Sequence, residues 1–381
     1  MRVETKLVHA GEPRPRHEGA VTLPIYQSST YTYAGAGTGD YHDVQYIRLN
    51  NTPNHTALHA KLAALEGTEQ ALVTASGMAA ISSTLFSVLE SGDHLLAHDG
   101  LYGGTYDLLT KDLPRLGITT TFVDASRPDT WAAHVTPRTR AFYVETITNP
   151  LAQVVALDEV ARFARAGNLL SIIDNTMATP INYRPIEHGF DLILHSATKY
   201  LNGHSDIVAG VVAGRGELVS AVKRKLDHLG GVLDPHACFL LQRGLKTLAL
   251  RIRYQNQSAL ELATFLARHP RVRVVNYPGL ETHPHHARAR AWLAGGGGIL
   301  SFELDGDVAA AEILFQRLAI PLVAPSLGGP ETLITRPATT SHAGLARDVR
   351  LRQGITDHLI RLSVGLEATA DLIEDFTAAL A

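Results

Sequence analysis

Short apolar runs alternate with helix-type patterns from about residue 51 to residue 243. Leu58, Leu62 and Leu65 recur at the spacing of one helix face. Thr52 and Pro53 before them supply a capping hydroxyl and a proline suited to the first helical position. The apolar runs have the length and composition of buried strands. The pattern predicts strands near 71–74, 95–98, 118–123, 141–145, 169–173, 191–195 and 207–212, and helices near 53–67, 78–88, 101–113, 131–135 and 158–166.

Alternation of strands and helices predicts an α/β fold with a mostly parallel sheet that helices cover on both faces. In such folds ligands bind beyond the carboxyl ends of the strands. Several polar residues are expected at or just after those ends: Tyr102, Glu145, Asn149, Asp174 and Lys199.

The pattern changes after residue 243. An apolar-periodic helix, long enough to bridge two domains, is expected from 237 to about 266. Strands near 272–275, 299–304 and 358–364 and helices near 309–318 and 369–380 follow it. We therefore expect a large domain over 51–243 and a smaller α+β domain over 244–381.

Residues 1–50 show little periodicity and contain Pro13, Pro15, Pro24 and a Gly35, Gly37, Gly39 cluster. This segment is expected to be an extended arm that needs another surface to order it. Tyr46 and Arg48 near its end offer an aromatic ring and a guanidinium suited to a phosphate. The arm can serve its own subunit or a neighbour.

Composition narrows the class of protein. At 381 residues, with 45% hydrophobic and 19% charged residues, the chain has the size and composition of a globular protein with room for two domains. The net charge of −3 carries no polyanion-binding signature, so nucleic acid is not an expected partner. The single cysteine, Cys238, allows no intrachain disulfide or multi-cysteine metal site. No signal-type region or membrane-spanning apolar run is found, and a cytoplasmic enzyme is expected.

Asp174 and Lys199 suggest a specific chemistry. A lysine at the mouth of a buried strand has its pKa lowered by desolvation, and the neutral amine attacks carbonyls. A strand-end carboxylate requires a cationic or hydrogen-bonding partner, which a pyridinium N–H supplies. An imine-forming lysine with an acid at the ring nitrogen is what pyridoxal 5'-phosphate (PLP) needs as an electron sink. The helix start at Ser76–Met78, with the hydroxyls of Ser196 and Thr198, would hold the phosphate.

The residues give less support to other functions. A lone Ser-x-Thr-Lys is more often a surface loop, and a non-catalytic binding module would leave the Asp174 and Lys199 pair without a role. An oxidoreductase would need a Gly-x-Gly-x-x-Gly turn after the first strand, which 295–298 does not provide. A metal hydrolase is suggested by 19 histidines, especially His283, His285 and His286, but these lack an acidic partner at ligand spacing, so a solvated face is expected.

The motifs together resemble a known family. The segments LAALEGTEQALVTASGMAAI, LYGGTYDLL, ETITNP, IIDNT, HSATKYLNGHSD and LIRLSVGLE, spread over most of the chain, are similar to the PLP-dependent enzymes of cysteine and methionine metabolism. These include cystathionine γ-synthase, cystathionine γ- and β-lyases and methionine γ-lyase. The resemblance implies a fold type I, aminotransferase-like large domain, assembled as a homotetramer of two active dimers.

The resemblance also implies roles for residues. Lys199 would bind the cofactor as an imine and then move protons, with Tyr102 stacked on the ring as a second candidate base. Asp174 would pair with the pyridine nitrogen. Gly77, Met78, Ser196 and Thr198 would hold the phosphate, together with Tyr46 and Arg48 of the neighbouring subunit. Arg361, with Asn149 and Ser326, would bind the substrate α-carboxylate.

The expected reaction is cleavage of a carbon–sulfur bond in cystathionine or a related amino acid, giving an oxo acid, ammonia and a thiol. A γ-synthase or homoserine-ester sulfhydrylase and a methionine γ-lyase are the alternatives. The chain departs from the family pattern at three places. Asn50–Asn54 replaces a GNPT-like segment, Gly104 stands where methionine γ-lyases have cysteine, and Pro325 stands where many members have a glutamate for the distal amino group of cystathionine.

Overall fold

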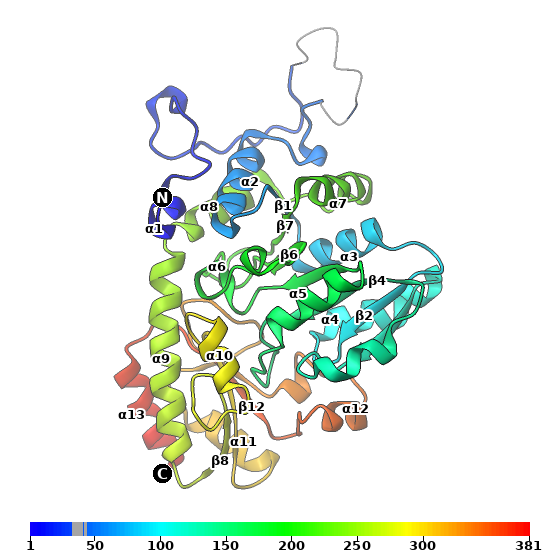
Figure 1. Cartoon of the computed structure of the whole chain (residues 1–381). Helices are drawn as coiled ribbons and strands as arrows, with labels where there is room; N and C mark the ends of the chain where they lie inside the picture. The colour runs from blue at the N-terminus through cyan, green and yellow to red at the C-terminus, as the bar shows by residue number, and fades with distance from the viewer. Residues whose placement is uncertain (33–40, 42–43) are drawn as a thin grey trace.

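The strands predicted in the first two thirds of the chain form one seven-stranded sheet (Figure 1). The structure is a computed structural model and describes residues 1–32, 41 and 44–381. The strand order is β1-β7-β6-β5-β4-β2-β3; β7 is antiparallel to both neighbours, and the other pairs are parallel. The prediction of a mostly parallel α/β sheet is therefore confirmed. The strands are β1 (Gln70–Thr74), β2 (His94–His98), β3 (Thr119–Val123), β4 (Thr139–Glu145), β5 (Leu170–Asp174), β6 (Leu192–Ser196) and β7 (Gly210–Gly214).

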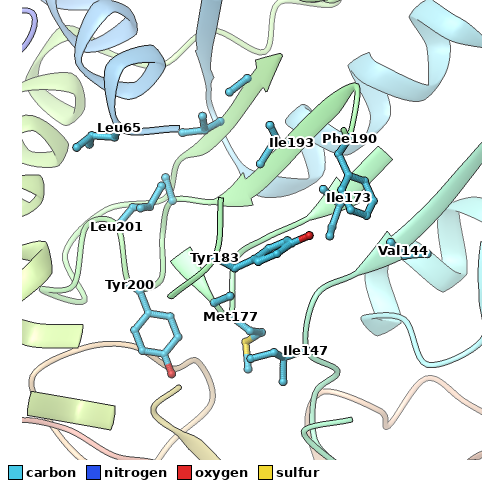
Figure 2. Packing of buried hydrophobic residues seen from close by; sticks show 14 of the residues in the cluster. Leu65, Val144, Ile147, Ile173, Met177, Tyr183, Phe190, Ile193, Tyr200 and Leu201 are labelled. Carbon is cyan, nitrogen blue, oxygen red and sulfur yellow. The ribbon is translucent and has the colours of Figure 1, made fainter. Parts of the chain in front are cut away.

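Helices cover both faces of this sheet because its strands carry apolar side chains on alternating sides. Val73 and Ile193 pack with Leu62 of α2 in one buried cluster, part of which Figure 2 shows. Their chain neighbours Leu72 and Leu194 pack with helix α3 in a second cluster. The helices around the sheet are α2 (Pro53–Glu66), α3 (Gly77–Val88), α4 (Gly103–Asp107), α5 (Leu157–Ala166), α6 (Thr179–Asn182), α7 (Gly216–Leu229) and α8 (Pro235–Leu245).

The last third of the chain forms a second, five-stranded sheet in the order β10-β11-β12-β9-β8. Phe302 and Phe376 lie in its core, which α9 and α13 help to enclose. The smaller α+β unit is thus observed, while its boundary at residue 243 stays a prediction. The elements are α9 (Leu248–Arg268), β8 (Val272–Asn276), α10 (His286–Trp292), β9 (Ile299–Leu304), α11 (Val308–Arg317), β10 (Leu322–Val323), β11 (Leu333–Thr335), α12 (Arg347–Arg352), β12 (Ile360–Ser363) and α13 (Thr369–Leu380).

The prediction of a single helix from 237 to about 266 is wrong, because the structure has two helices, α8 and α9, with a break at 246–247. The buried side chain of Arg251 stabilises this break. Its Nη2 donates to the carbonyl of Gly244 (2.8 Å), and its Nη1 donates to that of Tyr200 (2.8 Å). The guanidinium thereby ties the break to the loop that carries Lys199.

The N-terminal arm is also shorter than expected. Helix α1 (Val3–His9) packs on α2 of the same chain, with Leu7 buried and Lys61 Nζ donating to the Leu7 carbonyl at 2.9 Å. The cluster of Gly35, Gly37 and Gly39 lies outside the described residues. The expected capping bond of Thr52 is wrong, since its hydroxyl bonds His55 Nδ1 at 2.7 Å instead. Within the described chain, no helix is both long and apolar enough to cross a membrane.

Candidate active site

A cavity of about 700 Å³ opens at the carboxyl ends of β4, β5 and β6. Its far wall comes from the segments at 325–327 and 340–341 and from Arg361 on β12, so both sheets contribute to it. Most of the sequence-predicted site residues line it: Gly77, Met78, Tyr102, Asn149, Asp174, Ser196, Thr198, Lys199, Ser326 and Arg361. Asp174 and Lys199, on which the sequence argument depended, thus face one cavity.

Lys199 lies on the tight loop that follows β6. The loop is fixed by its backbone, because Lys199 N–H donates to the Ser196 carbonyl (3.1 Å) and Thr198 N–H to the Ala209 carbonyl (3.1 Å). The Nζ atom donates to Ser326 Oγ at 2.8 Å. Burial, helped by the positive charge of Arg361, lowers the pKa of Lys199 below its usual range. A larger fraction of this amine is therefore neutral at a given pH than for an exposed lysine.

Asp174 ends β5, directly beside Glu145 at the end of β4. Its Oδ1 accepts a hydrogen bond from the Thr176 N–H (2.9 Å), and Thr176 Oγ1 in turn accepts from the Ser196 N–H (2.7 Å). Burial raises the pKa of Asp174, while the hydrogen bonding with Thr176 opposes this shift. A protonated ring nitrogen at this carboxylate would supply a cationic, hydrogen-bonding partner for it.

The N-terminus of α3 provides an anion site on the other side of the cavity. Ser76 caps the helix by accepting from the Ala79 N–H (3.0 Å), which leaves the first helical N–H groups, at Gly77 and Met78, directed outward. A Cβ atom at residue 77 would lie only 2.8 Å from Ser196 Cβ, so glycine is needed for this close approach. Together with the Ser196 hydroxyl, this turn fits a phosphate, and the set of residues fits PLP. The Thr198 hydroxyl also lines the cavity but donates to the Ala209 carbonyl (3.1 Å), so it would have to turn to donate to a phosphate.

Arg361 is the clearest substrate-binding candidate. It is 2% exposed, and its Nη2 donates to the Ser326 carbonyl at 2.6 Å. Its Nε is buried without a hydrogen-bond partner, and no carboxylate of the described residues pairs with it. Burial lowers its pKa to about 10, so it remains charged at neutral pH. Asn149 also lines the cavity, where its side-chain amide N–H groups could donate to a carboxylate. A buried, unpaired guanidinium is costly, and a substrate carboxylate would satisfy it.

Tyr102 precedes α4 and keeps 45% of its surface exposed. Its backbone N–H donates to Glu145 Oε1 at 2.7 Å. A Cβ atom at residue 104 would lie 2.6 Å from the Tyr102 ring and 3.2 Å from Met78 Sδ. The glycine at 104 therefore permits this ring position, and a cysteine there would displace the ring or its neighbours.

Tyr46 and Arg48 do not line the cavity of their own chain. Arg48 instead donates to the Asp227 carbonyl (2.6 Å) and to the Tyr41 hydroxyl (2.7 Å), and its guanidinium carbon lies 5.9 Å from the Tyr46 ring centre. Glu145, which the sequence analysis expected at a strand end but gave no role in the site, also lines the cavity. Its signal was present, because Glu145, like Asp174, ends an apolar strand.

The histidines considered for a metal site have a different setting from the one expected. His283 is buried and packs edge-on against His285, with ring centres 5.7 Å apart, so the expected solvated face is wrong for His283. Among the residues that the structure describes, no group of His, Cys, Asp and Glu could hold a metal ion. Cys238 is buried in α8, as the sequence indicated.

Comparison with known proteins agrees with this geometry. A family model described as "Cys/Met metabolism PLP-dependent enzyme" matches residues 4–381. Cystathionine gamma-lyase of Bacillus subtilis (strain 168) is 43% identical over 381 residues, covering 100% of this chain and 99% of the relative. Cystathionine beta-lyase of Lactococcus lactis subsp. cremoris (strain MG1363) is 42% identical, covering 99% and 98%. The crystal structure of cystathionine gamma-lyase from Lactobacillus plantarum complexed with L-serine matches with a TM-score of 0.95 at 38% identity, covering 100% of this chain and 98% of that one.

Proposed function

The chain belongs to the family of PLP-dependent enzymes of cysteine and methionine metabolism, and from that premise we propose that it cleaves the carbon–sulfur bond of cystathionine or a related sulfur amino acid. One observation supports this proposal most. A lysine with a lowered pKa and a buried, unpaired arginine face the same cavity, at the carboxyl ends of the strands. This arrangement provides a base and a carboxylate-binding group for an amino acid substrate.

Residues that line the cavity would supply groups for the phosphate, the ring nitrogen and the aldehyde carbon of the cofactor. Gly77, Met78, Ser196 and Thr198 would hold its phosphate, Asp174 its ring nitrogen and Lys199 its aldehyde carbon. Tyr102 would lie over the ring. When bound, PLP withdraws electrons from the bonds at the substrate Cα and so makes the Cα proton acidic.

The protein groups then determine where protons go. Arg361 and Asn149 would bind the α-carboxylate and thereby place the Cα–H bond near Lys199 Nζ. The neutral Lys199 amine would take this proton, and Ser326 Oγ, 2.8 Å from Nζ, would orient the amine. A thiol on Cβ can then leave directly. A thiol on Cγ requires removal of a second proton, from Cβ, for which Lys199 and the Tyr102 hydroxyl are the candidate bases.

Incubation with cystathionine alone tests this function. A lyase releases an oxo acid, ammonia and a thiol in equal amounts without any added nucleophile. Product formation only when a homoserine ester and a thiol are both supplied would instead establish γ-replacement, the reaction of a synthase or sulfhydrylase. The oxo acid released from cystathionine then separates the two cleavages, because β-cleavage gives pyruvate and γ-cleavage gives 2-oxobutyrate.

Among the described residues that line the cavity, none would offer the far end of a cystathionine substrate a charge that is free of another proposed role. Among the described residues, the acidic and basic ones that line the cavity are Glu145, Asp174, Lys199 and Arg361. The last three have proposed roles toward the cofactor and the α-carboxylate, and Glu145 accepts the Tyr102 N–H. Residue 325, an exposed proline on the cavity wall, carries no charge there. We therefore expect P325E to raise kcat/KM for cystathionine by about tenfold, because a charge-assisted hydrogen bond contributes roughly 1.5–3 kcal/mol.

The same substitution should leave kcat/KM for homocysteine nearly unchanged, since that substrate has no distal amino group. P325Q is the matched control, because it has a similar size without the charge. An equal gain in P325Q, or no gain for cystathionine in P325E, would show that residue 325 does not meet the distal amino group.

We also propose a homotetramer of two active dimers in which Tyr46 and Arg48 complete the neighbour's site. Their position away from the cavity of their own chain supports this. A mixture of R48A and K199A chains should then recover about a quarter of wild-type activity, because half of the dimers are mixed and each has one intact site. No recovery, in dimers shown to exchange subunits, would mean that Arg48 serves its own subunit.

A cytoplasmic location stays a prediction, which cell fractionation would test.

A further inference from the structure

The proposed mechanism assigns no role to Glu145. It ends β4, is 6% exposed and lines the cavity. Its Oε1 accepts the hydrogen bond from the Tyr102 N–H at 2.7 Å. No cationic group of the described residues acts on its carboxyl group. Glu145 therefore holds the backbone of the residue whose ring would cover the cofactor, without an ion pair of its own.

The neighbouring strand brings a second acid close to Glu145. Glu145 and Asp174 are register partners on the parallel strands β4 and β5, so their side chains lie on the same side of the sheet. Two adjacent buried carboxylates repel each other, and one of them then tends to keep its proton. Burial and the charge of Asp174 raise the pKa of Glu145 to about 8. Of the two acids, Asp174 is the one that carries the negative charge, because hydrogen bonding with Thr176 stabilises its ionised form.

Contacts on the other side of Tyr102 limit where its ring can lie. The ring lies close to Gly104, where an added Cβ would approach it to 2.6 Å. The next residue, Gly103, is held against the second sheet's segment, since a Cβ there would lie 2.7 Å from the Ser341 carbonyl oxygen. The hydrogen bond to Glu145 is thus the polar contact that fixes Tyr102 from the sheet side.

We propose that Glu145 is a positioning residue: as an uncharged acid it fixes Tyr102 over the cofactor and leaves Asp174 as the single anion at this edge of the sheet. This proposal rests on the proposed PLP-dependent function. The two strand-end acids then have different roles: Glu145 positions Tyr102 through its backbone N–H, and Asp174 faces the ring nitrogen.

The test compares E145Q with E145L in the full-length holoenzyme. The Gln carbonyl can accept the Tyr102 N–H without a charge, so E145Q should keep kcat/KM and cofactor affinity within about threefold of wild type, less than the loss of a typical hydrogen bond. E145L has a similar volume and no acceptor, and misplacement of Tyr102 should lower kcat/KM by roughly a hundredfold and weaken cofactor binding. A loss in E145Q as large as in E145L would show that the charge of Glu145 is needed and would overturn the proposal.

A double-variant comparison separates positioning of Tyr102 from a general packing role. If Glu145 acts through Tyr102, then Y102A and the combined Y102A/E145L variant should have the same cofactor dissociation constant, because the effect is already lost. Additive losses would contradict the proposal. Cofactor binding and oxo-acid release by the unsubstituted enzyme are measured first, so failure there counts against the proposed function rather than against Glu145.

Discussion

Replacing Lys199 with alanine is expected to lower turnover by roughly a thousandfold or more, because the variant loses both the amine that binds the cofactor aldehyde and the base that takes the Cα proton. The fold should remain, since the side chain makes one hydrogen bond, to Ser326, and the loop is held by its backbone. Oxo-acid release, measured beside a thermal melt, checks both expectations. No other lysine lines the cavity in the described residues.

K111A is a suitable control for that experiment. Lys111 is 58% exposed and pairs only on the surface, with Asp107, so its loss should leave both turnover and melting temperature nearly unchanged. Activity retained in K199A at the level of K111A would remove Lys199 from the mechanism and with it the proposed route of proton transfer.

Arg361→Lys is expected to raise KM by roughly 10- to 150-fold, which corresponds to about 1.5–3 kcal/mol of lost charge-assisted hydrogen bonding. A lysine keeps the charge but cannot present two parallel N–H groups to a carboxylate. The effect should be large because Arg361 is buried and its Nε has no hydrogen-bond partner in the described residues, so a substrate carboxylate would satisfy that donor.

Steady-state kinetics with a single sulfur amino acid measures this change. R253K is the matched control, since Arg253 is half exposed and pairs with Glu4 away from the cavity. An unchanged KM in R361K would mean that the α-carboxylate binds elsewhere in the cavity, and Asn149 would then be the next group to substitute.

The sheet and most of the site could be predicted because both follow from local patterns. Each buried parallel strand leaves an apolar run, and the rule that ligands bind at strand carboxyl ends places Asp174 and Lys199 together without any coordinates. The sequence alone did not show why particular loop positions need glycine. The need for glycine at residue 77 appears only when Ser196 is seen beside it.

The errors come from contacts between segments far apart in the sequence. The break between α8 and α9 depends on Arg251 reaching the Tyr200 carbonyl, which no periodicity reveals. Helix α1 is too short to be stable alone and forms because it packs against α2. Helix α7 is the exception: its amphipathic pattern is local and could have been predicted from the sequence, but it was not. The role suggested for Glu145 depends on a hydrogen bond to the loop after β2, and so required the tertiary structure.

Borohydride reduction of the purified holoenzyme, followed by proteolysis and mass spectrometry, tests most directly that Lys199 holds the cofactor. The account predicts that the yellow colour is lost and that a reduced pyridoxyl phosphate group is found on the peptide that contains Lys199, and on no other. A label on a different lysine, or a protein that binds no PLP under any loading condition, would contradict it.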